Sequence, residues 1–169
     1  MSMVLKFIVA MLLSSAVAAN CEFGFSKDQE KLMRLAYATG YPDDLGYTLA
    51  SIAWKESFVG KYIIRDNVKD GNYGSFGVTH VQLSTAMHML GIKNSWQARQ
   101  DLLPRMVTDD VFTLRLSLRY LKQHSDLPYR QMVSRYNGRG EMAEKYAEDV
   151  INRVHRLINC NYFKDMTRI

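Results

Sequence analysis

The chain of 169 residues carries a net charge of +5, and its length is that of one domain with a core of useful size. Its Lys and Arg residues are scattered rather than clustered, which argues against nucleic acid as a partner. A mildly basic domain suits an anionic partner of another kind, such as an acidic polymer or a membrane surface.

The first 19 residues have the pattern of a secretory signal peptide. Lys6 gives a positive start, residues 7–13 form an apolar run, and small residues at 14–19 suit signal peptidase. The run is too short for an uncleaved membrane anchor, which needs about 18 or more apolar residues. We therefore expect a cleaved signal at 1–19 and an exported mature domain, periplasmic or secreted, at 20–169.

The two cysteines, Cys21 and Cys160, bracket this mature domain. In an oxidising compartment they would form a disulfide that joins the N-terminal segment to the last helix. The alternative is two unpaired thiols, with Cys21 acylated as the first residue of a lipoprotein. Asn20 before it is bulkier and more polar than lipoprotein processing usually accepts, so the lipid anchor ranks second.

Helical periodicity dominates the chain, with no repeats, no low-complexity tract and no linker. The predicted helices cover residues 26–39, 44–57, 85–90, 95–102, 109–124, 127–136 and 141–159. Ser26 and Gln29 predict a capping box for the first helix, Asp43 or Asp44 caps the second, and Pro104 and Thr108 are expected to separate the fourth helix from the fifth. The last helix should bury one apolar face, formed by Met142, Tyr146, Val150, Val154, Leu157 and Ile158.

One segment departs from the helical pattern. Tyr62, Ile63 and Ile64 favour a strand, and the sequence Asp70-Gly71-Asn72 is a turn signal. We expect a small hairpin or long loop around residues 60–78. The predicted fold class is therefore mainly α, as a single compact α+β domain.

The second helix carries a carboxylate on its apolar face. Leu45, Leu49 and Ile52 recur at helical spacing, and Glu56 continues the series. A glutamate there is costly unless it is paired, protonated or lining a cleft. Burial raises the pKa of a carboxyl group, which is what a general acid near neutral pH requires. The simpler alternative is that the helix frays near Trp54 and Glu56 points to solvent.

Several motifs follow Glu56 in a fixed order. They are Glu56-Ser57, Gly74-Ser75-Phe76-Gly77, Val78-Thr79-His80-Val81, Thr85-Ala86, Arg135-Tyr136-Asn137-Gly138 and finally Tyr146. This order resembles the lysozyme-like lytic transglycosylases of the soluble, goose-lysozyme-related type. That family has a Glu-Ser pair ending a helix, a Ser-x-Gly-Leu-Met-Gln-Ile-x-Pro-x-Thr-Ala stretch and a late Ala-Tyr-Asn motif. The resemblance runs over residues 45–154 and implies a lysozyme-like fold.

The sequence departs from this family pattern at four positions. His80 stands in place of glutamine, Thr79 of methionine, Leu83 of proline, and Arg135 of the alanine before Tyr-Asn. These changes bear on glycan contacts and specificity more than on Glu56. Histidine, like glutamine, offers a donor and an acceptor to glycan hydroxyls.

The resemblance implies a lyase that cuts peptidoglycan with one carboxylic acid and no cofactor. The residue matched by Glu56 protonates the glycosidic oxygen between N-acetylmuramic acid and N-acetylglucosamine, and the substrate's own N-acetyl group stabilises the positive centre. The same residue then takes the proton of the 6-hydroxyl, which closes a 1,6-anhydro ring. The expected partner is the peptidoglycan glycan strand, and a monomer is expected.

The resemblance also assigns substrate-binding roles to Ser57, Ser75, Gly77, His80, Tyr136, Asn137 and Tyr146. Most of these residues have a structural alternative. Ser57 can be an ordinary polar residue at a helix end, and Asn137 a C-terminal cap before Gly138. Tyr136 and Tyr146 lie at helical spacing from apolar neighbours, so either can be a core aromatic. Gly77 lets the backbone border a sugar, but an ordinary turn also explains it.

Metal sites are rejected on the sequence. The four histidines lack ligand spacing for zinc. Asp66, Asp70 and Gly71 fit a calcium loop, but Val68 falls at a ligand position and Gly77 at that of the bidentate glutamate.

Three alternative functions stay open. A hydrolytic lysozyme would use a second carboxylate, with Asp66 or Asp70 as the candidate. A catalytically inactive glycan-binding module would explain His80, and a basic helical protein acting on membranes would explain the charge. A wall remodeller, an opener for a secretion or conjugation apparatus, and a phage protein would share the same residues.

Overall fold

The computed structural model describes residues 21–65 and 74–166 of the chain. The expected signal peptide, the Asp70-Gly71-Asn72 turn and the candidate carboxylates Asp66 and Asp70 lie outside these residues. The described part is mainly helical with a small antiparallel sheet, as predicted. Its elements are α2 (Lys27–Gly40), η2 (Tyr41–Asp43), α3 (Gly46–Ser57), β1 (Ile64–Arg65), β2 (Ser75–Phe76), β3 (Val81–Gln82), α4 (Leu83–Leu90), α5 (Trp96–Thr108), α6 (Asp110–Lys122), α7 (Tyr129–Tyr136) and α8 (Glu141–Asn159).

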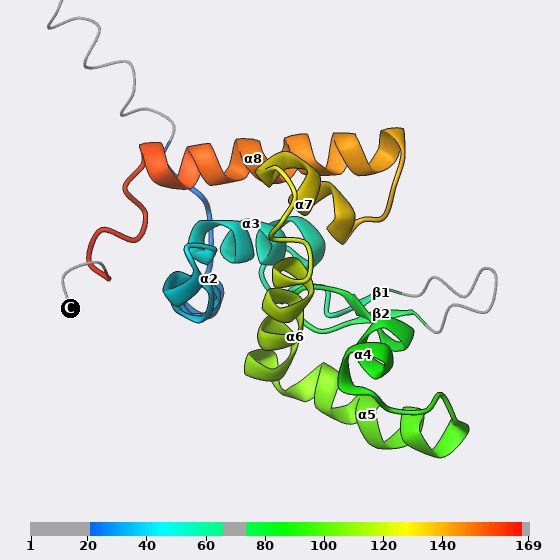
Figure 1. Ribbon diagram of the computed structural model, residues 1–169. Helices are drawn as coiled ribbons and strands as arrows, with labels where there is room; N and C mark the ends of the chain where they lie inside the picture. The colour runs from blue at the N-terminus through cyan, green and yellow to red at the C-terminus, as the bar shows by residue number, and fades with distance from the viewer. Residues whose placement is uncertain (1–20, 66–73, 167–169) are drawn as a thin grey trace, which may run out of the picture.

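Helix α3 is the central element of the fold. It packs against α2 and α8 and also contacts α6, while α7 packs on α8 (Figure 1). The sheet, α4 and α5 lie towards the end of α6 that is away from α7 (Figure 1). Leu49 and Ala53 join one apolar cluster with α2, and Leu45 and Ile52 join a second with α7 and α8. Because α3 contributes to both clusters, it holds the helical part of the molecule together.

The start of α3 differs from the prediction. Asp43 belongs to the 3-10 turn η2, and Asp44 follows it in the left-handed conformation with φ of 58°. Leu45 is therefore the N-terminal capping residue, and no side chain caps the helix. The physical reason is Pro42, whose fixed φ favours the tight turn and uses up the two aspartates before the helix begins.

The start of α2 agrees with the prediction. The Ser26 hydroxyl accepts a hydrogen bond from the Gln29 backbone amide, and the Gln29 side chain accepts one from the Ser26 amide at 2.9 Å. The Gln29 side chain also donates to the Phe58 carbonyl at 2.7 Å, just past the end of α3. This capping box therefore joins the beginning of one helix to the end of the next.

Two helix predictions were wrong in detail. Pro104 does not end a helix, since α5 continues through it to Thr108. Burial of Leu102 and Met106 on either side outweighs the lost backbone hydrogen bond. In α8, Met142 and Ile158 are exposed. The buried face of α8 contains Ala143, Tyr146, Ala147, Val150, Val154 and Leu157. Small alanines lie there because the helix packs closely on α3 and α7.

The predicted hairpin is present as β1 and β2, which pair antiparallel with Ile64 opposite Phe76. A third strand, β3, extends the sheet and places Val81 opposite Phe76 on its other side. The four-residue turn 77–80 connects β2 to β3 and begins with Gly77 at φ of 78°. This turn brings His80 back towards the end of α3.

Cys21 and Cys160 form the predicted disulfide, with 5.5 Å between their Cα atoms. The bridge lies beside an aromatic cluster of Phe23, Phe25 and Tyr162. The rings of Phe23 and Tyr162 are in edge contact, with 4.8 Å between their centroids. It fixes the N-terminal segment against the C-terminal end of α8. None of the helices that the structure describes is both long and apolar enough to cross a bilayer.

Reduction of this disulfide should lower the melting temperature by several degrees. The bridge closes a loop between positions 139 apart, so it removes much entropy from the unfolded chain, worth about 2–5 kcal/mol. The measurement is thermal unfolding by circular dichroism with and without reductant. The double variant Cys21→Ser/Cys160→Ser is the control, because reductant should leave its melting temperature unchanged. Equal melting of oxidised and reduced wild type would contradict the prediction.

Candidate active site

Helix α3 ends immediately after Glu56 through an unusual backbone. Phe58 and Val59 have φ of 51° and 56°, and Gly60 follows at 77°. The left-handed region is costly for a β-branched residue such as Val59. Burial of the Val59 side chain and the hydrogen bond from its amide to the Ala53 carbonyl, at 3.1 Å, hold it there. Such strain persists only where the surrounding structure imposes it, and it is common at functional sites.

Ser57 is one of the groups that impose this turn. Its hydroxyl donates to the Val78 carbonyl at 2.7 Å and accepts from the Gly60 amide at 2.6 Å. The side chain is fully buried and does not line the cleft described below. Ser57 therefore fastens the end of α3 to the 77–80 turn, and the role predicted for it, orienting the substrate or the glutamate, stays a prediction. Glu56 is held in place through that link.

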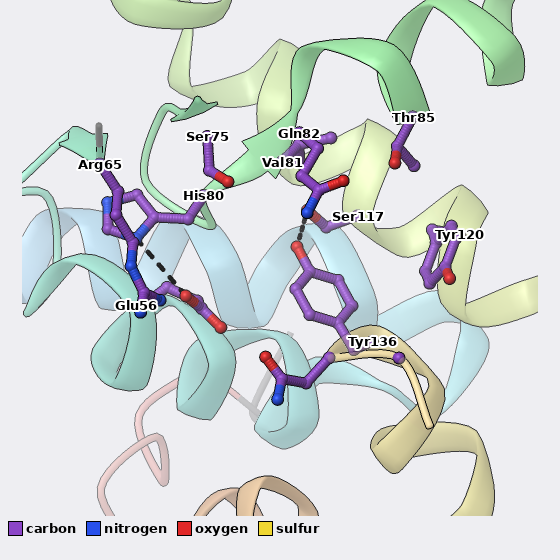
Figure 2. Close-up of a pocket in the computed structure, with 12 residues that line it drawn as sticks. Glu56, Arg65, Ser75, His80, Val81, Gln82, Thr85, Ser117, Tyr120 and Tyr136 are labelled. Atoms are coloured by element: carbon purple, nitrogen blue, oxygen red, sulfur yellow. Dashed lines mark hydrogen bonds and ion pairs between the residues drawn. The ribbon is translucent and has the colours of Figure 1, made fainter. Parts of the chain in front are cut away.

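A cavity of about 280 Å³ opens beside Glu56 (Figure 2). It is lined by Glu56, Arg65, Ser75, His80, Val81, Gln82, Thr85, Ser117, Tyr120, Tyr136, Asn137 and Gly138. These residues come from α3, all three strands, α4, α6 and the end of α7. Segments far apart in the sequence therefore meet at one cleft.

Glu56 is the only carboxyl group among the described residues that line this cleft. Its side chain is only 9% exposed, so the helix does not fray and the carboxyl does not point freely to solvent. Oε2 lies 3.4 Å from Nδ1 of His80, whose side chain is 5% exposed (Figure 2). The structure thus places a nearly buried carboxyl group and an imidazole together at the wall of the cleft.

His80 is oriented by its backbone and by its other ring nitrogen. The residue has φ of 49° at the end of the 77–80 turn, a conformation that histidine adopts more readily than most residues. Nε2 lies 2.5 Å from the backbone carbonyl of Tyr62. Nδ1 is buried and has no hydrogen-bond partner among the described residues. The ring is therefore fixed with a free nitrogen towards Glu56.

Tyr146 also faces Glu56, from α8. Its hydroxyl is buried and makes no hydrogen bond of normal geometry within the described part of the chain. Burial raises the pKa of Tyr146 well above its usual value, and the neighbouring charge of Glu56 adds to the rise. Tyr146 lies beside the acid without lining the cleft. A neutral hydroxyl in that position can donate to the carboxylate that Glu56 becomes.

Tyr136 lines the cleft and is held by a hydrogen-bond network. Its hydroxyl donates to the Thr79 carbonyl at 2.9 Å and lies 2.8 Å from the Ser117 hydroxyl (Figure 2). Ser117 in turn lies 2.6 Å from the Thr79 hydroxyl. Burial raises the pKa of Tyr136, while the Ser117 hydrogen bond opposes the rise and the charge of Glu56 adds to it. The network ties α6 and α7 to the 77–80 turn.

The structure brings most of the predicted site residues to one place. Ser75, His80, Tyr136 and Asn137 line the cleft with Glu56. Asn137 is also the C-terminal cap of α7, so both of its predicted roles coexist. Ser57, Gly77 and Tyr146 are outside the cleft lining.

Seven lining residues were not assigned a role from the sequence: Arg65, Val81, Gln82, Thr85, Ser117, Tyr120 and Gly138. Gln82 lies within the Ser75 to Ala86 stretch, so the motif itself was a signal for it. Ser117 and Tyr120 follow the ordinary periodicity of an amphipathic helix, which gives no sign that this part of α6 borders a cleft. No feature of the sequence indicated that Arg65 lines the cleft.

Gly77 lies where the backbone packs too closely against its neighbours to leave room for a side chain. A Cβ at this position would lie 2.4 Å from Cγ2 of Thr113 and 2.7 Å from the Met106 carbonyl oxygen. Those atoms belong to α6 and α5, which means that the glycine lets the turn approach two helices. Gly77 therefore allows a close backbone approach, and the substrate contact predicted for it stays a prediction.

Within residues 21–65 and 74–166, no three His, Cys, Asp or Glu side chains come together in a way that could hold a metal ion. Comparison of the chain with protein-family models, with curated proteins and with solved structures gives no match. The site must therefore be interpreted from its own chemistry.

Gly77→Ala should destabilise the protein strongly, and Gly91→Ala provides the matched control. Both glycines have positive φ, so each substitution costs about 1–2 kcal/mol in backbone strain. Gly91 has open space around it, whereas Gly77 would add a clash worth about 1–3 kcal/mol more. Urea unfolding of both variants measures the difference. Equal destabilisation would mean that Gly77 is needed only for its conformation.

Proposed function

We propose that this protein is a lysozyme-like enzyme that cleaves peptidoglycan glycan strands, with Glu56 as the catalytic acid. The observation that carries the proposal is the environment of Glu56. Its carboxyl group is nearly buried at a cleft wall, and the unpartnered His80 Nδ1 and Tyr146 hydroxyl both face it. A carboxyl group at the wall of a cleft, screened from bulk water, is placed where a general acid must lie.

The lining of the cleft supports a sugar as the ligand. Ser75, Gln82, Thr85 and Asn137 offer neutral hydrogen-bond donors and acceptors, which match the hydroxyl and amide groups of a glycan. Among the described lining residues, Arg65 is the only formal cation apart from a protonated His80. A polyanion such as nucleic acid would call for several. The proposed substrate is thus neutral along its backbone, as an N-acetylated glycan is.

A single carboxyl group among the described lining residues favours non-hydrolytic cleavage, the reaction of the lytic transglycosylases that the chain resembles. Glu56 would give its proton to the glycosidic oxygen as the bond from that oxygen to C1 breaks and its electron pair stays on the oxygen. The Glu56 carboxylate would then take the proton of the 6-hydroxyl while the 6-oxygen bonds to C1. Glu56 recovers its proton, no water is consumed and the product carries a 1,6-anhydro ring.

Hydrolysis on the same scaffold is the second candidate function. It requires a second carboxylate to act as base or nucleophile. Arg65 lines the cleft, and Asp66 follows it directly in the chain. Asp66 and Asp70 are therefore the residues on which this alternative depends.

Glu56→Gln should lower the cleavage rate by at least about 10²–10⁴-fold without unfolding the protein. The amide keeps the shape of the side chain but cannot exchange the proton. Clearing of a purified cell-wall suspension measures the rate, and circular dichroism checks the fold. Glu148→Gln is the control, because this glutamate is exposed on α8 and lies far from the cleft lining. Near wild-type clearing by Glu56→Gln would remove Glu56 as the acid.

The products should distinguish the two reactions. Digestion of purified sacculi should release muropeptides with anhydro ends, each lighter by one water than the reducing product of a hydrolase. Mass spectrometry of the released fragments provides the measurement. The double variant Asp66→Asn/Asp70→Asn should keep the activity of the wild type. Reducing ends, lost in that double variant, would instead establish the hydrolytic lysozyme.

A further inference from the structure

We propose that Glu56 and His80 share one proton, so that His80 acts as a positioning residue and sets the pH range in which Glu56 carries the proton needed for cleavage. This inference rests on the proposed function for its activity readout only. The geometry behind it is independent of any substrate: two side chains, each at least nine-tenths buried, face each other with Nδ1 and Oε2 3.4 Å apart.

The tautomer of His80 follows from its neighbour. A backbone carbonyl oxygen can only accept a hydrogen bond, so the 2.5 Å contact with Tyr62 requires a proton on Nε2. Nδ1 of the neutral ring is then an acceptor directed at Glu56. Two arrangements satisfy both groups: a protonated carboxyl donating to Nδ1, or a protonated Nδ1 donating to a carboxylate. Each holds one proton between the same two atoms.

The separation of 3.4 Å is longer than the 2.7–3.2 Å typical of a formed hydrogen bond. Rotation about the last torsion of the Glu56 side chain is soft and would shorten it. Without the shared proton, the lone pair of Nδ1 would face a carboxylate inside the protein. That arrangement is repulsive and leaves both groups unpaired, and one proton between the two atoms relieves it.

The other groups around the pair do not replace His80 as a proton partner. Arg65 from β1, Tyr120 from α6 and Tyr136 from α7 line the same cleft, and Tyr146 faces Glu56 from α8. Burial raises the pKa of Tyr136 and of Tyr146, so both stay neutral at physiological pH. Lys55, on the same helix as Glu56, is engaged in an ion pair with Asp149 of α8. An arginine does not exchange protons in proteins, which leaves the His80 imidazole as the described partner that lies against the Glu56 carboxyl.

The strained backbone at position 80 carries a histidine, and the shared proton gives a reason for this residue type. The turn reaches position 80 with φ of 49°, and a glycine or asparagine would adopt that conformation more easily. Glutamine, which stands here in the family that the chain resembles, offers a donor and an acceptor but cannot exchange a proton. Histidine at this position can exchange a proton with the acid.

The first experiment needs no activity. The full exported protein is labelled with ¹⁵N and ¹³C, and the Nδ1 signal of His80 and the carboxyl carbon of Glu56 are followed by NMR from acid to alkaline pH. A shared proton predicts that both signals change over the same pH interval, with Nε2 protonated throughout. Changes of the two signals in separate intervals would overturn the proposal.

The second experiment uses the pH dependence of cleavage. In His80→Gln the alkaline fall in activity should move to lower pH by about one unit, because the amide can donate to the carboxylate and no lone pair opposes it. His88→Gln is the matched control, since His88 is an exposed histidine on α4 and should leave the profile unchanged. An alkaline limb that stays in place in folded His80→Gln would overturn the proposal.

These two readouts separate the two proposals. If the wild type cleaves no glycan at any pH, the proposed function fails, while the NMR titration still decides whether the proton is shared. If His80→Gln does not fold, as thermal unfolding would reveal, the same wild-type titration decides the matter alone. If the protein cleaves glycan but Glu56 and His80 titrate independently, the proposed function stands and the shared proton is contradicted.

Discussion

Burial of the last turn of helix α3 is the constraint on which the site depends. The helix lies between α2, α6 and α8, so most of its side chains meet protein (Figure 1). A carboxyl group at the end of such a helix loses water and needs polar neighbours from other elements. His80 comes from the β2–β3 turn and Tyr146 from α8, and both present otherwise unpartnered atoms to Glu56. The need to accommodate one glutamate therefore connects three parts of the fold.

Two strained turns meet beside this carboxyl group. The chain leaves α3 through the left-handed residues Phe58 and Val59, and it returns through the 77–80 turn with His80 also left-handed. The Ser57 hydroxyl joins the two turns by its hydrogen bond to the Val78 carbonyl. Strain of this kind lowers stability but fixes the position of the groups that it carries. In this molecule it fixes both members of the Glu56–His80 pair.

The far wall of the cleft is fastened by polar contacts. Tyr136 and Ser117 bond to each other and to Thr79, which links α7, α6 and the 77–80 turn. Buried polar networks with satisfied partners specify one arrangement more sharply than apolar packing does. The network therefore holds Tyr136 and Ser117, two residues of the cleft lining, in fixed positions relative to the 77–80 turn.

The sequence by itself determined the helices with strong periodicity, the Ser26–Gln29 capping box, the Cys21–Cys160 pairing and the anomaly of Glu56, because each depends on local spacing or on simple pairing. Tertiary structure decided the rest. Pro104 stays helical because its neighbours are buried on both sides. Ser57 fastens a turn and Gly77 allows close packing, because they lie against Val78, Thr113 and Met106 from other elements of the fold. Arg65, Ser117 and Tyr120 joined the cleft for the same reason. A pattern along the chain records which face of an element is apolar, but only the packing of elements determines which polar side chains share a cavity.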